Sequence, residues 1–204
     1  MADYYTPTVI QQTIPDADMT PLERLLLSNI FESERDGEGW YFFSEQGPAD
    51  MILVDRGALE AALAESPVPG ENVANRLVTE HLAKLQAAER DAPLVDLDLS
   101  TTSWDFIVQD IVRRSPTLNY VSAVSSFTCS RMRADGFGGM AVVISSDAIL
   151  GKSTNDLLEE FIEQVTPSAD SRSTPQLAKR RPLQYGPRTP QCSLSEPRRR
   201  LPRA

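Results

Sequence analysis

The strongest constraint on the fold is a change in composition after Val165. Seven of the fifteen prolines lie in the last 39 residues, where no apolar periodicity remains. Such a segment buries too little apolar surface to offset the entropy of ordering its backbone. We expect one acidic globular domain in residues 1–165 and a disordered Pro/Arg-rich tail in residues 166–204. A functional basic tail and a frameshift remnant of a GC-rich gene are both consistent with this composition.

The net charge of the chain changes sign at the same place. Residues 166–204 contain nine Lys/Arg and two acidic residues, a net charge of +7. The whole chain carries −9, so residues 1–165 carry −16. An acidic body repels nucleic acid and attracts basic proteins, or occupies a site built for DNA. A basic tail is suited to weak contact with nucleic acid.

Several classes of protein are disfavoured by composition. Apolar runs such as Leu25–Leu27 and Met140–Ile144 are far shorter than the roughly 20 residues that span a membrane, and the N-terminus lacks a secretory pattern. One histidine and two cysteines are too few for a zinc site or a disulfide framework. We therefore expect a cytoplasmic protein with no membrane association, no metal and no cofactor.

Apolar spacing predicts five helices. The clearest is "TPLERLLLSNIFESE", where Thr20 is the N-cap, Pro21 takes the first helical position and Glu23 completes a capping box. We expect Asp36-Gly37 to end this helix. The other helices are predicted in "RGALEAALAES", "ENVANRLVTEHLAKLQAAERD", "TTSWDFIVQDIVRRS" and "KSTNDLLEEFIEQV".

Strand patterns lie between these helices. Tyr4–Ile14 is β-rich, with Pro7 favouring an edge position or a bulge, and "DMILVD" fits a strand or a helix start. Further strands are predicted in "GWYFFSE", "PLVDLDLS", "LNYVSAVSSFTCSRMR" and "GMAVVISS". Because the last two form a hairpin among interspersed helices, we predict an α+β domain with a mostly antiparallel sheet and helices packed on one face.

The stretch "FTCSRMRADGFGGMAVVI" is a candidate anion site. Its two arginines alternate along a predicted strand, and its glycines allow close backbone approach. Together they would hold a phosphate or carboxylate. The spacing matches neither G-x-G-x-x-G nor a P-loop, and a plain hairpin turn explains the glycines equally well. The candidate residues are Arg131, Arg133, Gly136, Gly138 and Gly139.

The aromatic run Trp40, Tyr41, Phe42 and Phe43 is a candidate interface. Side chains alternate along a strand, so Trp40 and Phe42 share one side and Tyr41 and Phe43 share the other. We expect one pair to face the core. The other pair either packs beneath a helix or contacts a partner, because exposed aromatic side chains favour protein interfaces.

No pattern indicates catalysis. Cys129 lies near two arginines, but its only possible histidine partner is His81, on a predicted helix. Asp96 and Asp98 share a strand face and are best interpreted as its solvated side. We therefore predict no catalytic residue.

Two stretches, "TPLERLLLSNIFE" and "FTCSRMRADGFGGMAVVISSDAI", resemble small uncharacterised proteins of bacterial plasmids and integrated mobile elements. The resemblance covers about residues 4–165 and leaves the tail outside. It implies a bacterial cytoplasmic setting and a role in maintenance or transfer of the element, or in evasion of host defence. It brings no catalytic residue with it.

The leading hypothesis is therefore an accessory or regulatory protein of a mobile element that acts by binding an unknown protein and is not an enzyme. One alternative is a nucleic-acid-associated protein that uses the 166–204 tail. Another is an acidic inhibitor whose clustered carboxylates mimic DNA phosphates. A further alternative is an anion-binding enzyme that uses the Arg131/Arg133 hairpin.

Overall fold

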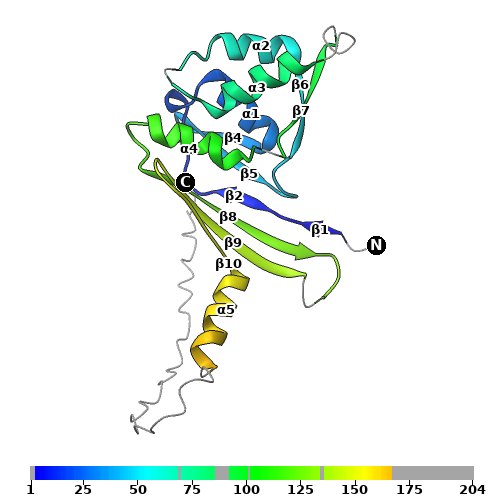
Figure 1. Cartoon of the computed structure of the whole chain (residues 1–204), viewed down its shortest axis with the longest axis vertical. Helices are drawn as coiled ribbons and strands as arrows, with labels where there is room; N and C mark the ends of the chain where they lie inside the picture. The colour runs from blue at the N-terminus through cyan, green and yellow to red at the C-terminus, as the bar shows by residue number, and fades with distance from the viewer. Residues whose placement is uncertain (1–2, 69, 86–91, 101, 134–135, 167–204) are drawn as a thin grey trace, which may run out of the picture. The chain divides into compact units, whose positions relative to one another are not determined.

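The computed structural model describes residues 3–68, 70–85, 92–100, 102–133 and 136–166. The chain divides into two units, residues 1–166 and residues 167–204. The predicted disordered tail lies outside the described residues, apart from Thr166. The α+β class with a mostly antiparallel sheet is confirmed within the first unit (Figure 1).

Eight strands of the described residues form the main sheet. The strand order is β10 (Ile149–Ser153), β9 (Phe137–Ser145), β8 (Tyr120–Cys129), β2 (Thr8–Ile10), β5 (Gly39–Ser44) and β3 (Ile14–Pro15). In addition, β1 (Tyr4–Tyr5) pairs with β8 and β4 (Glu32–Asp36) pairs with β5. A second sheet joins β6 (Met51–Asp55) to β7 (Leu94–Asp98). All these pairs are antiparallel.

Helices pack on one face of the main sheet, which we call the inner face, and the last of them extends beyond the end of β10 (Figure 1). The helices are α1 (Pro21–Ile30), α2 (Arg56–Ala64), α3 (Val73–Lys84), α4 (Trp104–Arg114) and α5 (Thr154–Val165), with a 3-10 turn at Asp16–Asp18. α4 contacts β8 and β9, α1 contacts β4 and β6, and α2 and α3 contact α1. Fully buried side chains of α1 and α4 share one apolar cluster with side chains of β2, β5, β8 and β9. The fully buried members of this cluster include Leu22, Leu26, Ile107, Ile111, Ile10, Phe42, Val121 and Ile144.

The first helix is shorter than the sequence predicts. Its capping box forms as expected, with Thr20 and Glu23 exchanging both hydrogen bonds. The helix ends at Ile30, however, and residues 32–36 form strand β4. Gly37, with a φ of 59°, lies in the two-residue turn to β5. Pairing with residues 39–43 of β5 therefore outweighs the local helical pattern of these acidic residues.

Strand β2 of the N-terminal segment lies inside the sheet and not at its edge. Pro7 separates β1 from β2, and β2 lies between β5 and β8, with Val9 opposite both Phe43 and Val124. The carbonyl of Pro7 accepts a hydrogen bond from the amide of Ser126 at 2.9 Å. A break between two short strands, both paired with β8 in one register, thus accommodates the missing proline N–H where the sequence suggested an edge position or a bulge.

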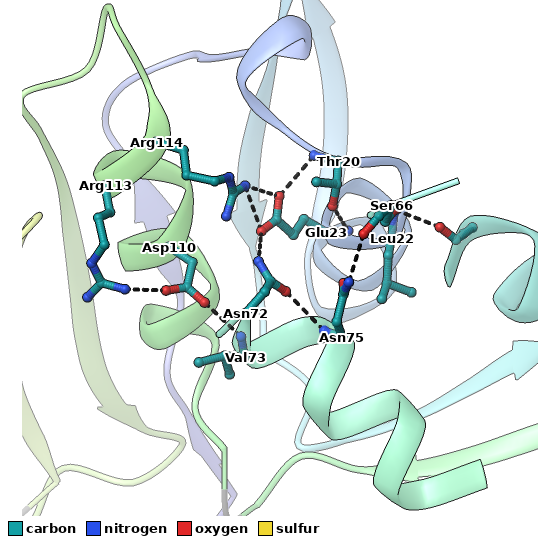
Figure 2. Close-up of polar contacts among 11 residues, drawn as sticks. Thr20, Leu22, Glu23, Ser66, Asn72, Val73, Asn75, Asp110, Arg113 and Arg114 are labelled. Atoms are coloured by element: carbon teal, nitrogen blue, oxygen red, sulfur yellow. Dashed lines mark hydrogen bonds and ion pairs between the residues drawn. The ribbon is translucent and has the colours of Figure 1, made fainter. Parts of the chain in front are cut away.

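A buried carboxylate ties three helices together (Figure 2). The side chain of Glu23 in α1 is 0% exposed. Nη2 of Arg114 in α4 donates to both of its oxygens, at 2.8 and 2.6 Å. Nδ2 of Asn72, the N-cap of α3, donates at 2.8 Å, and the amide of Thr20 donates at 2.9 Å. This one side chain therefore fixes the positions of α1, α3 and α4 relative to one another.

A second buried carboxylate supports the start of α3. Asp110 in α4 accepts a hydrogen bond from the amide of Val73 at 2.7 Å and from Nη1 of Arg113 at 2.5 Å (Figure 2). The first amides of a helix lack partners inside the helix, so an outside acceptor stabilises that end. The beginning of α3 is thus held by side chains of α4 as well as by its own N-cap.

Asp16 gives an acid-dependent contribution to stability. Its carboxylate accepts from Arg24 at 2.8 Å and from Trp40 Nε1 at 2.9 Å, and Arg35 lies 3.4 Å away. The hydrogen bond from Arg24, followed by that from Trp40, lowers the pKa of Asp16 below its ordinary value of 3.8. A carboxyl group whose pKa is depressed by folding stabilises the fold above its unfolded pKa. That contribution is lost as the pH falls through the folded pKa.

We therefore expect Asp16→Asn to lower the melting temperature at pH 5–7. The difference from the parent protein should shrink as the pH falls below about 3.8. Thermal unfolding followed by circular dichroism between pH 7 and pH 2.5 measures this. Asp147→Asn is the matched control, since Asp147 is exposed and makes no hydrogen bond within the described part of the chain. A constant difference at every pH would contradict the expectation.

Candidate functional site

Helix α5 is built on a complete N-terminal capping box. Oγ of Ser153 accepts from the amide of Asp156 at 3.2 Å, and Oδ2 of Asp156 accepts from the amide of Ser153 at 2.7 Å. The second of these hydrogen bonds is the main cause that lowers the pKa of Asp156. This cap starts α5 directly at the end of β10. Reciprocal capping of this kind stabilises a helix that has little tertiary packing.

The apolar side of α5 is exposed. Five side chains fall on one side of the helix, because their positions follow helical spacing. No residue of α5 is buried, and the five side chains are 38–77% exposed. We call this set the α5 stripe: Leu157, Leu158, Phe161, Ile162 and Val165.

α4 shows what such a pattern does elsewhere in the same chain. Its apolar residues Ile107, Val108, Ile111 and Val112 are all buried against the sheet and the other helices. α5, by contrast, has its closest contacts with β9 and β10, and Figure 1 shows it extending beyond the end of β10. The α5 stripe is thus the apolar face of an amphipathic helix, and no described element packs over it.

The aromatic strand divides its side chains between the two faces of the sheet. Phe42 is fully buried, and Trp40 packs against the core and donates to Asp16. Tyr41 and Phe43 lie on the opposite, outer face, where their rings stack with centroids 5.5 Å apart. Both are partly exposed. The interface role stays a prediction, and the outer pair is the part of the run that a partner can reach.

An apolar row crosses the outer face of the sheet beside Phe43. Residues directly opposite one another in neighbouring antiparallel strands share a face. The register places Phe43 opposite Val9, Val9 opposite Val124, and Val124 opposite Ala141. Lys152 and Glu32 continue the row at its two ends. Pairing of strands far apart in sequence makes this row, so local sequence patterns gave no sign of it.

The candidate anion loop is arranged differently from the sequence expectation. Gly138 and Gly139 belong to β9, opposite Phe127 and Ser126, and the turn precedes them. They lie beneath the start of α5. A Cβ on Gly138 would meet Oγ1 of Thr154 at 3.1 Å, and the amide of Gly139 donates to the same oxygen. These glycines therefore let the start of α5 approach β9 closely, and both lie in the strand, whereas the hairpin-turn explanation had assigned them to the turn.

The remaining members of that candidate site lie beyond the end of β8. Gly136 is buried, and a Cβ there would lie 2.8 Å from Cβ of Cys129. Arg131 and Arg133 are exposed, whereas Cys129 is buried. β8 ends at Cys129, so the expected alternation along one strand face does not continue through the arginines. Anion binding by these residues stays a prediction.

Of the other residues singled out from the sequence, His81, Asp96 and Asp98 line surface hollows bordered by α3 and β7, whereas Cys129 does not. His81 is in α3 and Cys129 is at the end of β8, and both Asp96 and Asp98 are exposed on β7. The hydrogen bonds from Ser100 lower the pKa of Asp98. Among the described residues, no group of three or more His, Cys, Asp and Glu side chains is placed to hold a metal ion.

Comparison of the chain with protein-family models, curated proteins and solved structures finds no match. In the part of the chain that the structure describes, no helix has both the length and the apolar character to span a membrane.

Proposed function

We propose that the chain is an accessory or regulatory protein that acts by binding another protein, with no chemistry of its own. The observation that carries the proposal is the exposed α5 stripe. Large apolar surfaces left open on a folded domain mark interaction sites. Fully burying one aliphatic or aromatic side chain contributes about 1.5–3 kcal/mol, so this stripe offers substantial binding energy to a partner.

The way α5 is attached supports the same proposal. The helix begins without a loop after β10, and Thr154 is anchored to β9 by the hydrogen bond from Gly139. A capped helix on a sheet is presented in one defined orientation, which lowers the entropic cost of binding. The setting on a bacterial plasmid or integrated element rests on the two sequence stretches that carry that resemblance.

Site-specific photo-crosslinking in bacterial cells tests this function. A photoreactive amino acid is placed at Phe161, within the α5 stripe, or at Glu163, on the opposite side of α5. We expect a discrete cross-linked product with another protein from position 161 and none from position 163. No product from either position, or only a dimer of the 22.6 kDa chain, would overturn the proposal.

A further inference from the structure

The α5 stripe has a carboxylate along each of its edges. Side chains three or four positions apart are neighbours on a helix. Glu159 therefore stands beside Ile162 at one edge, and Glu160 stands beside Leu157 at the other. α5 also contains the acidic residues Asp156 and Glu163, and it contains no Lys or Arg. Any partner that covers this apolar surface must therefore also accommodate negative charge along both of its edges.

The first unit as a whole is also negative, although one lysine offsets part of the charge of α5. Lys152, at the end of β10, forms an ion pair with Glu160 and offsets one of the four acidic residues of α5. Residues 1–165 as a whole carry a net charge of −16. Such a field attracts positively charged partners and raises their rate of association.

The same charges disfavour a second copy of the chain on the α5 stripe. Packing one α5 on another would bring Glu159 and Glu160 of both copies to the rim of a single contact. Like charges placed together at one rim repel each other, and this repulsion destabilises the contact. Complementary charge therefore favours, over a second α5, an occupant that carries Lys or Arg beside its own apolar residues.

We propose that the α5 stripe docks a basic amphipathic helix of a partner protein. Its Leu, Ile or Phe side chains would lie on the stripe, and its Lys or Arg side chains would pair with Glu159 and Glu160. This is recognition of one amphipathic helix by the apolar face of another. The inference rests on the proposed function and adds the chemistry of the partner.

A labelled peptide tests the docking directly. The peptide has leucines at helical spacing along one face and Lys or Arg elsewhere, and its fluorescence anisotropy is measured with the full chain. One comparison peptide replaces every Lys and Arg by Glu. Another keeps the composition but disperses the leucines around the helix. We expect the basic amphipathic peptide to bind with a Kd at least about tenfold lower than either comparison peptide.

Variants of the chain locate the contact. Phe161→Ser and Ile162→Ser should each raise the Kd at least about tenfold. Glu159→Gln combined with Glu160→Gln should raise it at low salt and flatten its salt dependence. Glu32→Gln combined with Glu34→Gln on β4 is the matched control and should leave the Kd unchanged. Because all these positions are on the surface, far-UV circular dichroism should be the same for every variant.

Three outcomes would overturn the inference. Equal binding of the peptide with dispersed leucines would indicate general attraction to an acidic protein. An equal effect of the β4 control would place the contact elsewhere. Sedimentation that shows a dimer abolished by Phe161→Ser would assign the stripe to a second copy. If position 161 still cross-links to another protein in cells while the basic peptide fails to bind, this inference fails and the proposed function stands.

Discussion

Replacing Arg114 by methionine is expected to lower the free energy of unfolding by about 3–5 kcal/mol. Arg114 supplies two of the hydrogen bonds to Glu23, which is 0% exposed. Removing the guanidinium leaves a carboxylate in the core with only Asn72 and the Thr20 amide as donors. An uncompensated buried charge costs far more than the lost ion pair contributes.

Urea denaturation measures this effect, and two further variants control it. Arg76→Met, an exposed position on α3, should change the free energy of unfolding by less than about 0.5 kcal/mol. Adding Glu23→Gln to Arg114→Met removes the buried charge and keeps an acceptor oxygen for one of the two remaining donors, Thr20 or Asn72, so it should recover part of the loss. A double variant as unstable as Arg114→Met would show that packing of the arginine stem, and not the charge, is responsible.

Replacing Phe42 by alanine is the second large effect, with an expected loss of about 3–5 kcal/mol in the free energy of unfolding. Phe42 is 0% exposed, and its ring lies 6.4 Å from that of Phe31 between centroids. Truncation would leave a cavity in the centre of the core, because neighbouring side chains relax only partly into the space.

Phe43→Ala is the matched control for this prediction. The residue is next in sequence, has the same side chain and belongs to the same strand, but it lies on the outer face beside Tyr41. We expect a loss of about 1 kcal/mol, the value of a partly exposed aromatic pair. Similar losses from the two substitutions, measured by urea denaturation, would contradict the assignment of opposite faces.

Local sequence patterns were sufficient to predict much of the fold. Both capping boxes, at Thr20 and Ser153, involve residues three positions apart, so the sequence is enough to identify them. The alternation in "PLVDLDLS" and the hairpin of β8 and β9 are local in the same way. β4 was missed because its stability comes from pairing with β5, and its charged residues have no strand pattern of their own.

The candidate surface was harder to predict for a related reason. The amphipathic pattern of α5 is readable from the sequence, but exposure is not, since α4 has a similar pattern and buries it. The glycines at 138 and 139 indicated close backbone approach correctly. The approaching group is Thr154 of the chain itself, however, and local spacing cannot distinguish this from a ligand.

The position of the N-terminal segment determines when the sheet can be completed. Thr8 lies opposite Ser44 on one side and Ser125 on the other, so β2, which is made before both partner strands, must wait for residues made much later. Contacts across such sequence separations slow folding, because a long loop must close before they form. In a cell, β2 and β5 would therefore emerge from the ribosome well before β8 is available to pair with β2.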